Sequence, residues 1–237
     1  MGADMKTVGI IGGTGPESTV AYYRLIIDAY RKSNQDGSYP PIIINSINLT
    51  KLLSLVEANE LAAISDYLLA EVHKLARAGA DFGVLSSNTP HLVFDDIRSK
   101  SPIPLISIVE ATCQAADLQG LRRLVLLGTR FTMRAHFYPE VFSKRGISIC
   151  PPADDEQTYI HEKYMREFVM GIFSPEARER LLQIVARMKV DEGVDGVILG
   201  GTELPLILTT ATVKDVGIPF LDTSQIHVNA IVAELLG

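Results

Sequence analysis

The sequence predicts an α/β fold of two pseudo-symmetric domains, each a mainly parallel sheet flanked by helices. Strand-like apolar runs alternate with segments of helical periodicity along the chain, an alternation typical of parallel sheets. The pattern also begins again in the second half, where residues 195–205 match residues 81–91. A repeat of this length indicates duplication of a whole domain rather than a solenoid.

The first domain is expected to begin with a buried strand at residues 7–11, the glycine-rich residues 12–15 and a helix start. This arrangement directs backbone N–H groups at an anion, either a phosphate or a carboxylate. Ser18 stands where the dinucleotide fingerprint has its third glycine, and the strand at 42–44 ends in Asn45 rather than an acid. NAD binding is therefore not expected, and the missing Gly-Lys-Ser/Thr excludes a P-loop.

The later elements follow from the same two periodicities. Apolar residues at steps of three and four predict an amphipathic helix over residues 57–78, ended by Gly79. Ser174-Pro175-Glu176 is typical of a helix start, and we expect this helix to run through Met188. Short apolar runs predict further strands at residues 82–85, 103–108, 124–127, 196–200 and 218–221.

The last strand and helix, residues 218–235, match the end of the first repeat but come after the second one. Such a tail can return to complete the first domain. We therefore expect a first domain of residues 1–100 plus 213–237 and a second domain of residues 101–212. Because no long linker separates them, the two domains are expected to pack closely, with the active-site cleft between them.

Composition narrows the class of partner. The net charge of −6 is spread along the chain without a basic block, which argues against nucleic acid and membrane surfaces. The polar N-terminus and the lack of an apolar run of roughly 20 residues favour a cytoplasmic protein. The two cysteines, Cys113 and Cys150, lack the spacing of a metal site or redox pair and are expected to be core thiols. No metal is expected, and a small carboxylate or amino acid is the favoured partner.

Polar residues gather where strands end. In open α/β sheets, ligands bind beyond the carboxyl ends of the strands. The loops at residues 12–14, 86–91, 128–132 and 200–203 are therefore expected to converge. Their neutral hydrogen-bonding groups, combined with helix N-termini, suit a small carboxylate better than a metal.

These same loops carry five motifs that resemble the aspartate/glutamate racemase superfamily over nearly the whole chain. The motifs are Gly-Gly-Thr-Gly-Pro-Glu-Ser-Thr at 12–19, Asn-Thr-Pro-His at 88–91, Gly-Thr-Arg-Phe-Thr-Met at 128–133, Leu-Gly-Gly-Thr-Glu at 199–203 and Asp-Thr-Ser-Gln-Ile-His at 222–227. The resemblance implies two pseudo-symmetric α/β domains and no cofactor. It also implies proton transfer at the Cα of a small acidic amino acid, aspartate or glutamate, held between the halves.

The resemblance also identifies two catalytic positions. In most such enzymes each half supplies a cysteine: one thiolate removes the Cα proton, and the opposite thiol returns a proton to the other face. Those positions are Ser87 and Gly201 in this chain. A similar branch accepts a hydroxyl residue at the first position, but Gly201 has no side chain, and a serine hydroxyl needs an adjacent base. Activity is therefore expected to be reduced or altered.

Neighbouring residues could take over the roles of the two missing cysteines. His91 could act as a base or proton donor for Ser87, or could fix the loop as a structural residue. Glu203 could act as a base from the second wall, or could bond backbone groups at a helix start. The candidate substrate-binding residues, with loop capping as their alternative role, are Thr14, Gly15, Asn88, Thr89, Thr129, Thr132 and Thr202. The candidate cations for a distal carboxylate are Lys51, Arg130, His161 and Lys163.

Three functions remain open from the sequence. The leading hypothesis is a cofactor-independent, racemase-type isomerase. The alternatives are a non-catalytic small-carboxylate-binding protein of the same fold and a one-sided proton-transfer enzyme such as a decarboxylase. A homodimer is also considered, because the helix that carries Tyr22 and Tyr23 offers apolar surface.

Overall fold

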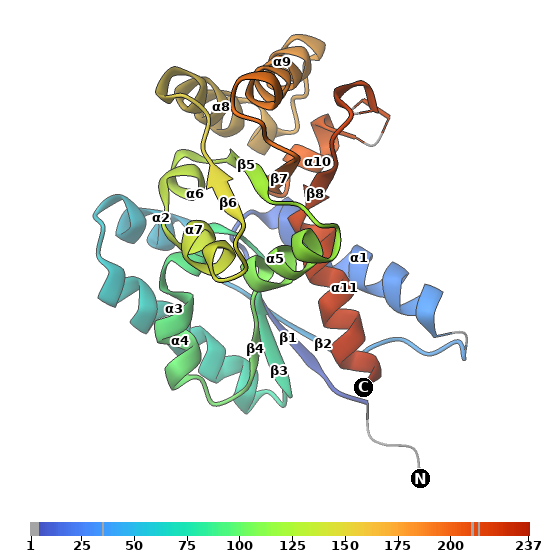
Figure 1. The fold of residues 1–237 in the computed structure, drawn as a ribbon. Coiled ribbons are helices and arrows are strands. Elements are labelled where there is room, and N and C mark those ends of the chain that lie inside the picture. Colours follow the sequence, from blue (N-terminus) through green and yellow to red (C-terminus); the bar gives the residue numbers. More distant parts are fainter. Residues whose placement is uncertain (1–4, 35, 210, 213) are drawn as a thin grey trace. The chain divides into compact units, whose positions relative to one another are not determined.

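The fold consists of two four-stranded parallel sheets with flanking helices, which confirms the predicted α/β class (Figure 1). The computed structural model describes residues 5–34, 36–209, 211–212 and 214–237. Its contacts divide the chain into unit 1, Met1–Ile108 with Ser224–Gly237, and unit 2, Val109–Thr223. The crossings lie somewhat after the positions near 100 and 213 that the sequence suggests.

Unit 1 is built on a sheet with strand order β2-β1-β3-β4. Helices α1 and α11 cover one face of this sheet, and α3 and α4 lie on the other side (Figure 1). The elements are β1 (Val8–Gly12), α1 (Pro16–Ser33), β2 (Ile42–Ser46), α2 (Leu49–Glu57), α3 (Leu61–Arg77), β3 (Phe82–Leu85), the 3-10 helix η1 (Thr89–Val93), α4 (Phe94–Lys100), β4 (Leu105–Ile106) and α11 (Thr223–Leu236).

The core of unit 1 follows the predicted periodicities. All residues of β1 and β3 are buried, as expected for central strands of a parallel sheet. The buried face of α3 includes Ile64, Leu68 and Val72, which follow one another at the steps of four that predict this helix. Tyr22 is buried against the sheet, so that of the Tyr22 and Tyr23 pair only Tyr23 is exposed.

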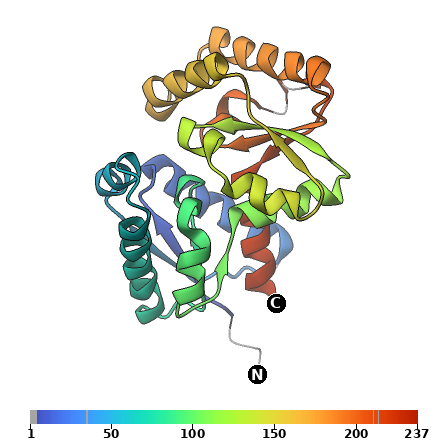
Figure 2. The same cartoon turned by 60° about the vertical axis from the view of Figure 1, so that its left-hand side comes forward.

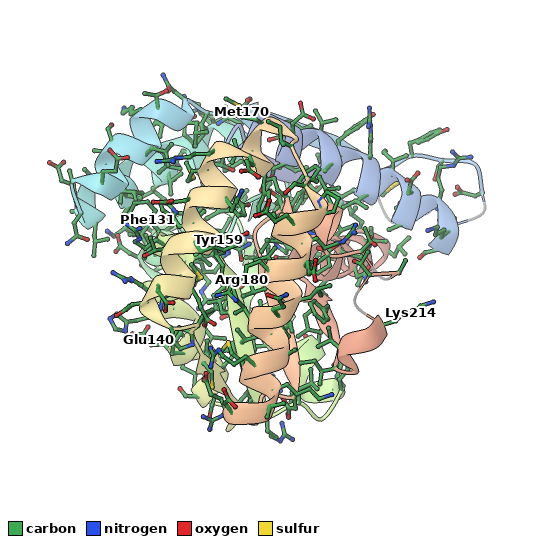
Figure 3. The ribbon with its side chains drawn as sticks, turned by 90° about the horizontal axis from the view of Figure 1, so that it is seen from above. Phe131, Glu140, Tyr159, Met170, Arg180 and Lys214 are labelled. Atoms are coloured by element: carbon green, nitrogen blue, oxygen red, sulfur yellow. The ribbon has the colours of Figure 1, made fainter. Side chains whose placement is uncertain are left out.

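Unit 2 repeats the arrangement with strand order β6-β5-β7-β8. Figure 2 shows α8 and α9 covering one face of this sheet, and Figure 3 shows the two helices side by side, with Tyr159 and Arg180 labelled. The elements are α5 (Ile108–Leu118), β5 (Arg123–Gly128), α6 (Arg130–Arg134), α7 (Phe137–Ser143), β6 (Ser148–Cys150), α8 (Asp154–Arg166), η2 (Phe168–Met170), α9 (Pro175–Asp191), β7 (Gly196–Gly200), α10 (Leu204–Ile207), η3 (Lys214–Val216) and β8 (Phe220–Asp222).

Both cysteines lie in the interior of unit 2. Cys113 and Cys150 are buried and free, and burial raises the pKa of each thiol above its usual value. Neither thiol is therefore activated as a nucleophile. No helix among the described residues is long and apolar enough to cross a membrane. Within the same residues, no three His, Cys, Asp or Glu side chains gather in a way that could hold a metal ion.

Candidate active site

The first polar loop of unit 1 follows β1 and depends on glycine. Gly13 and Gly15 have φ values of 79° and 127°, in the region that favours glycine. The Gly13 N–H donates to Thr19 Oγ1 at 2.7 Å, which closes the loop onto the first turn of α1. The loop thereby holds Thr14, whose Oγ1 is buried and has no hydrogen-bond partner among the described residues.

Beside it, a second polar loop follows β3, the strand that pairs with β1. The buried Ser86 ties the loop down: its hydroxyl donates to the Ile11 carbonyl at 3.0 Å, and its own carbonyl accepts from Ser18 Oγ at 2.9 Å. The next residue, Ser87, is half-buried, and its hydroxyl makes no hydrogen bond to any part of the chain that the structure describes. Asn88 is buried and Thr89 half-buried at the start of η1.

His91 uses both ring nitrogens to hold this loop. Its Nδ1–H donates to the Ser87 carbonyl at 3.0 Å, and its Nε2 accepts the Ile108 N–H at 3.3 Å. The ring also stacks on Phe94, with centroids 4.7 Å apart. Burial lowers the pKa of His91 to about 3, so the imidazole is neutral at neutral pH. The bond to Ser87 reaches its carbonyl and not its hydroxyl, which is the geometry of a residue that fixes the loop.

His227, which ends the last sequence motif, is a second buried imidazole in unit 1. Its Nε2–H donates to the Ile106 carbonyl at 3.1 Å, and its Nδ1 accepts the Tyr22 hydroxyl at 3.0 Å. Burial lowers the pKa of His227 to about 4. Sequence reasoning gave this histidine no role, although its motif pointed to the position. Together with His91 it holds the segment from β4 to the start of α5.

In unit 2 the loop after β5 carries Arg130, one of the four candidate cations for a distal carboxylate. Thr129 caps α6 by accepting the Thr132 N–H at 3.4 Å, and the two hydroxyls lie 3.3 Å apart. The backbone N–H of Arg130 donates to His161 Nδ1 at 3.2 Å. Arg130 Nε is buried and lacks a hydrogen-bond partner within the described ranges. Burial, and then the charge of Arg130, lower the pKa of His161, so Arg130 is the cation of this pair.

The other two candidate cations are engaged elsewhere. Lys163 forms an ion pair with Glu167 at 2.5 Å, one helical turn further along. Lys51, in unit 1, lies over the Tyr67 ring at 4.3 Å from its centroid. Of the cations that the sequence offers, Arg130 alone combines a loop at a strand end with a buried donor that lacks a partner.

The loop after β7 holds Gly201, Thr202 and Glu203, next to the loop after β5. Glu203 Oε2 accepts two hydroxyl hydrogens, from Thr202 Oγ1 at 2.8 Å and from Tyr164 of α8. Burial, followed by the Glu203 carboxylate, raises the pKa of Tyr164 well above its usual value. A Cβ on Gly201 would lie 2.6 Å from Tyr164 Cε2 and 2.8 Å from Cζ.

Tyr164 is the residue of this loop cluster that sequence reasoning missed. It comes from the last turn of α8, a helix that carries none of the five motifs, and its contact with Gly201 depends on how α8 packs on the sheet. The predicted site residues of unit 1 lie at the ends of β1 and β3: Thr14, Gly15, Ser87, Asn88, Thr89 and His91. Those of unit 2 lie at the ends of β5 and β7: Thr129, Thr132, Gly201, Thr202 and Glu203.

Known proteins share both the sequence pattern and the fold. The profile of the Asp/Glu/Hydantoin racemase family matches residues 11–231. The broad specificity amino-acid racemase RacX of Bacillus subtilis is 25% identical over 228 residues, which cover 92% of each chain. The crystal structure of an aspartate racemase homologue from Pyrococcus horikoshii superposes with a TM-score of 0.86 at 33% identity, covering 98% of this chain and 100% of that one. The aspartate racemase of Picrophilus torridus shares the fold, with a TM-score of 0.74 at 21% identity over 97% of this chain and 94% of that chain.

Proposed function

The chain belongs to the Asp/Glu/Hydantoin racemase family, and from this premise we propose that it is a cofactor-independent isomerase that transfers a proton at the Cα of aspartate or glutamate. Family membership makes it a racemase-type enzyme. The choice of an acidic amino acid, and the residues that act on it, are our proposal. They are supported by the chemistry of the loops in each unit.

The proposal of an acidic substrate rests on Arg130. A buried guanidinium nitrogen without a partner loses the free energy of a hydrogen bond, on the order of 1–3 kcal/mol, which a carboxylate ligand would restore. The planar guanidinium can donate two parallel hydrogen bonds to the two oxygens of a carboxylate. The buried Thr14 hydroxyl, also without a partner among the described residues, offers a second donor at the equivalent strand end of unit 1. We propose that Arg130 binds the distal carboxylate of the substrate.

The proposed substrate-binding residues otherwise donate or accept neutral hydrogen bonds. Thr14, Gly15, Asn88 and Thr89 belong to unit 1, and their backbone N–H groups stand at the starts of α1 and η1. Thr129, Thr132 and Thr202 are the corresponding candidates at the ends of β5 and β7 in unit 2. We propose that they hold the α-carboxylate and α-amino groups and leave Cα free to react.

Ser87 and Glu203 are the proposed proton carriers, one for each face of Cα. In one direction the Glu203 carboxylate accepts the Cα proton, the C–H electron pair delocalises into the α-carboxylate, and the Ser87 hydroxyl donates a proton to the opposite face. The step leaves an alkoxide on Ser87, which is an unfavourable intermediate until solvent returns a proton to it. His91 supports Ser87 by fixing its loop. Turnover is therefore expected to be slower than in an enzyme with two thiols.

Hydrogen exchange at Cα tests this function. The protein is incubated in D₂O with L- and D-aspartate and with L- and D-glutamate, and the products are followed by NMR and chiral chromatography. We expect deuterium at Cα together with the opposite enantiomer. Measurable binding of these amino acids without any exchange would contradict the proposal and favour a carboxylate-binding protein.

A one-sided reaction is the second candidate, and the missing side chain of Gly201 favours it. If one face of Cα lacks a working proton carrier, the enzyme protonates from a single side, as a decarboxylase does. Exchange with retention of configuration, and no inversion, is the result that this candidate predicts in the same experiment.

A further inference from the structure

The space that a side chain at position 201 would occupy is filled by the ring of Tyr164. The internal repeat sets Gly201 opposite Ser87, so unit 2 lacks a hydroxyl or thiol at the position where unit 1 has one. The ring of Tyr164 reaches that place from α8: Cε2 and Cζ lie within 2.8 Å of where a Cβ on residue 201 would stand, and the hydroxyl oxygen lies closer still. A ligand that approaches Gly201 along the direction of a side chain therefore meets the phenol.

Glu203 binds this phenol in a way that prepares a proton transfer. Both Tyr164 and Thr202 donate to the same carboxylate oxygen, Oε2, and Oε1 makes no hydrogen bond within the part of the chain that the structure describes. A carboxyl oxygen has two lone pairs, so Oε2 can accept from both hydroxyls at once. The Tyr164 proton thus already points at the group that can accept it.

We propose that the Tyr164 hydroxyl replaces the missing side chain at position 201 and exchanges the proton with Cα, while Glu203 takes up the phenol's own proton. This inference rests on the proposed racemase function and refines the role of Glu203 within it. Tyr164 is then the catalytic residue of unit 2. Glu203 acts through it.

The step balances without any further reactant. As the Cα–H bond breaks, its proton forms a bond to the Tyr164 oxygen, and the phenol proton moves to Glu203 Oε2. The C–H electron pair stays on the substrate and delocalises into its α-carboxylate. Tyr164 ends as a phenol and Glu203 as a neutral acid, and the reverse step returns the proton to Cα. Because burial raises the pKa of Tyr164, a free phenolate is unfavourable, and the two transfers are expected to occur together.

The packing of Tyr164 depends on its aromatic ring and not on its hydroxyl. Tyr164 contributes to the core of unit 2 and packs edge-on against Phe168, with centroids 6.1 Å apart, contacts that a phenylalanine would keep. Tyr164→Phe therefore separates the hydroxyl from the packing. Tyr159→Phe is the matched control, since Tyr159 lies on the same helix and packs against the same core (Figure 3).

The test measures racemisation and Cα deuterium exchange from both enantiomers in wild type and variants. For Tyr164→Phe we expect racemisation to fall by about 100-fold or more, with KM changed by less than about threefold. Exchange should be lost for the enantiomer whose Cα–H faces the Tyr164 side. The other enantiomer should still exchange with retention, as Ser87 releases its own proton to solvent and the resulting alkoxide takes up the Cα proton. Tyr159→Phe should behave as wild type.

Glu203→Gln provides a second variant that keeps an oxygen acceptor for the phenol but cannot take up its proton. We expect the same loss, on the same enantiomer, and the double variant with Tyr164→Phe should be no slower than either single variant, because the two groups act as one unit. Loss that is equal for both enantiomers, or Tyr164→Phe racemising within threefold of wild type, would overturn the inference while leaving the proposed function intact. A wild-type protein without exchange would overturn both.

Discussion

Gly201 and Tyr164 show how one side chain can occupy the space of another that is absent. The glycine could be recognised from the sequence because the internal repeat aligns it with Ser87. The tyrosine could not, because its position depends on the packing of α8 against the sheet and not on spacing along the chain. The same limit applies to Arg130: the sequence offered four cations, and burial with an unmet donor distinguishes this one.

A cysteine at position 201 is expected to destabilise the protein. The new Cβ would overlap the Tyr164 ring, and forcing atoms into a packed core costs about 1–3 kcal/mol. Gly201→Cys should therefore lower the melting temperature measured by calorimetry. In a Tyr164→Ala background, where the space is open, adding the cysteine should cost little or should stabilise. Equal costs in both backgrounds would show that the ring does not fill this place.

Replacing Arg130 should weaken substrate binding. Arg130→Gln keeps a polar side chain but removes the charge, and a hydrogen bond to a charged group is worth about 1.5–3 kcal/mol. KM for aspartate or glutamate should rise by about 10- to 100-fold, with a smaller change in kcat. Arg134→Gln, on the same helix but paired with Asp154 at the surface, is the control. An unchanged KM for Arg130→Gln would remove this residue from the site.

At the scale of elements, periodicity predicted most strands and several of the longer helices, and two differences in their bounds have local causes. The helix expected over residues 57–78 begins only at Leu61, because Asn59 adopts a left-handed φ of 55° between α2 and α3. The strand expected at residues 103–108 is limited to Leu105–Ile106, since α5 already begins at Ile108. Within each unit, topology was enough to predict which polar loops lie at neighbouring strand ends. Their hydrogen bonds were not predictable in this way.

The two buried histidines of unit 1 predict acid sensitivity. An unfolded histidine binds a proton below about pH 6.5, whereas the pKa values of His91 and His227 in the folded protein are about 3 and about 4. Protons therefore bind the unfolded chain preferentially between these values. Stability that is fully present above pH 6.5 should be lost as the pH falls toward 4, by several kcal/mol in total.

Denaturant titrations between pH 4 and pH 8 measure this loss. His227→Gln should be less stable than wild type at pH 8 but should lose less stability on acidification. His136→Gln, which changes an exposed histidine, should follow the wild-type curve. If His227→Gln has the same pH slope as wild type, the buried imidazole is not the source of the acid sensitivity.

At the scale of the whole molecule, the same arrangement of strands occurs in both units, since the strand orders β2-β1-β3-β4 and β6-β5-β7-β8 are equivalent. The repeat was visible in the sequence because both copies kept their strand and glycine pattern. The two copies differ in chemistry. Unit 1 presents a serine hydroxyl, with its loop held by a buried histidine, and unit 2 presents a glycine, with a tyrosine and a glutamate beside it. We propose that this asymmetry makes proton transfer unequal on the two faces of Cα.

Cα exchange in D₂O, measured separately for the L and D enantiomers of aspartate and glutamate, tests this account most directly. The account predicts that the wild-type protein incorporates deuterium from both enantiomers of at least one of these amino acids, with inversion. It predicts that Tyr164→Phe loses exchange from one enantiomer only. Binding of all four compounds without any deuterium at Cα would contradict the account.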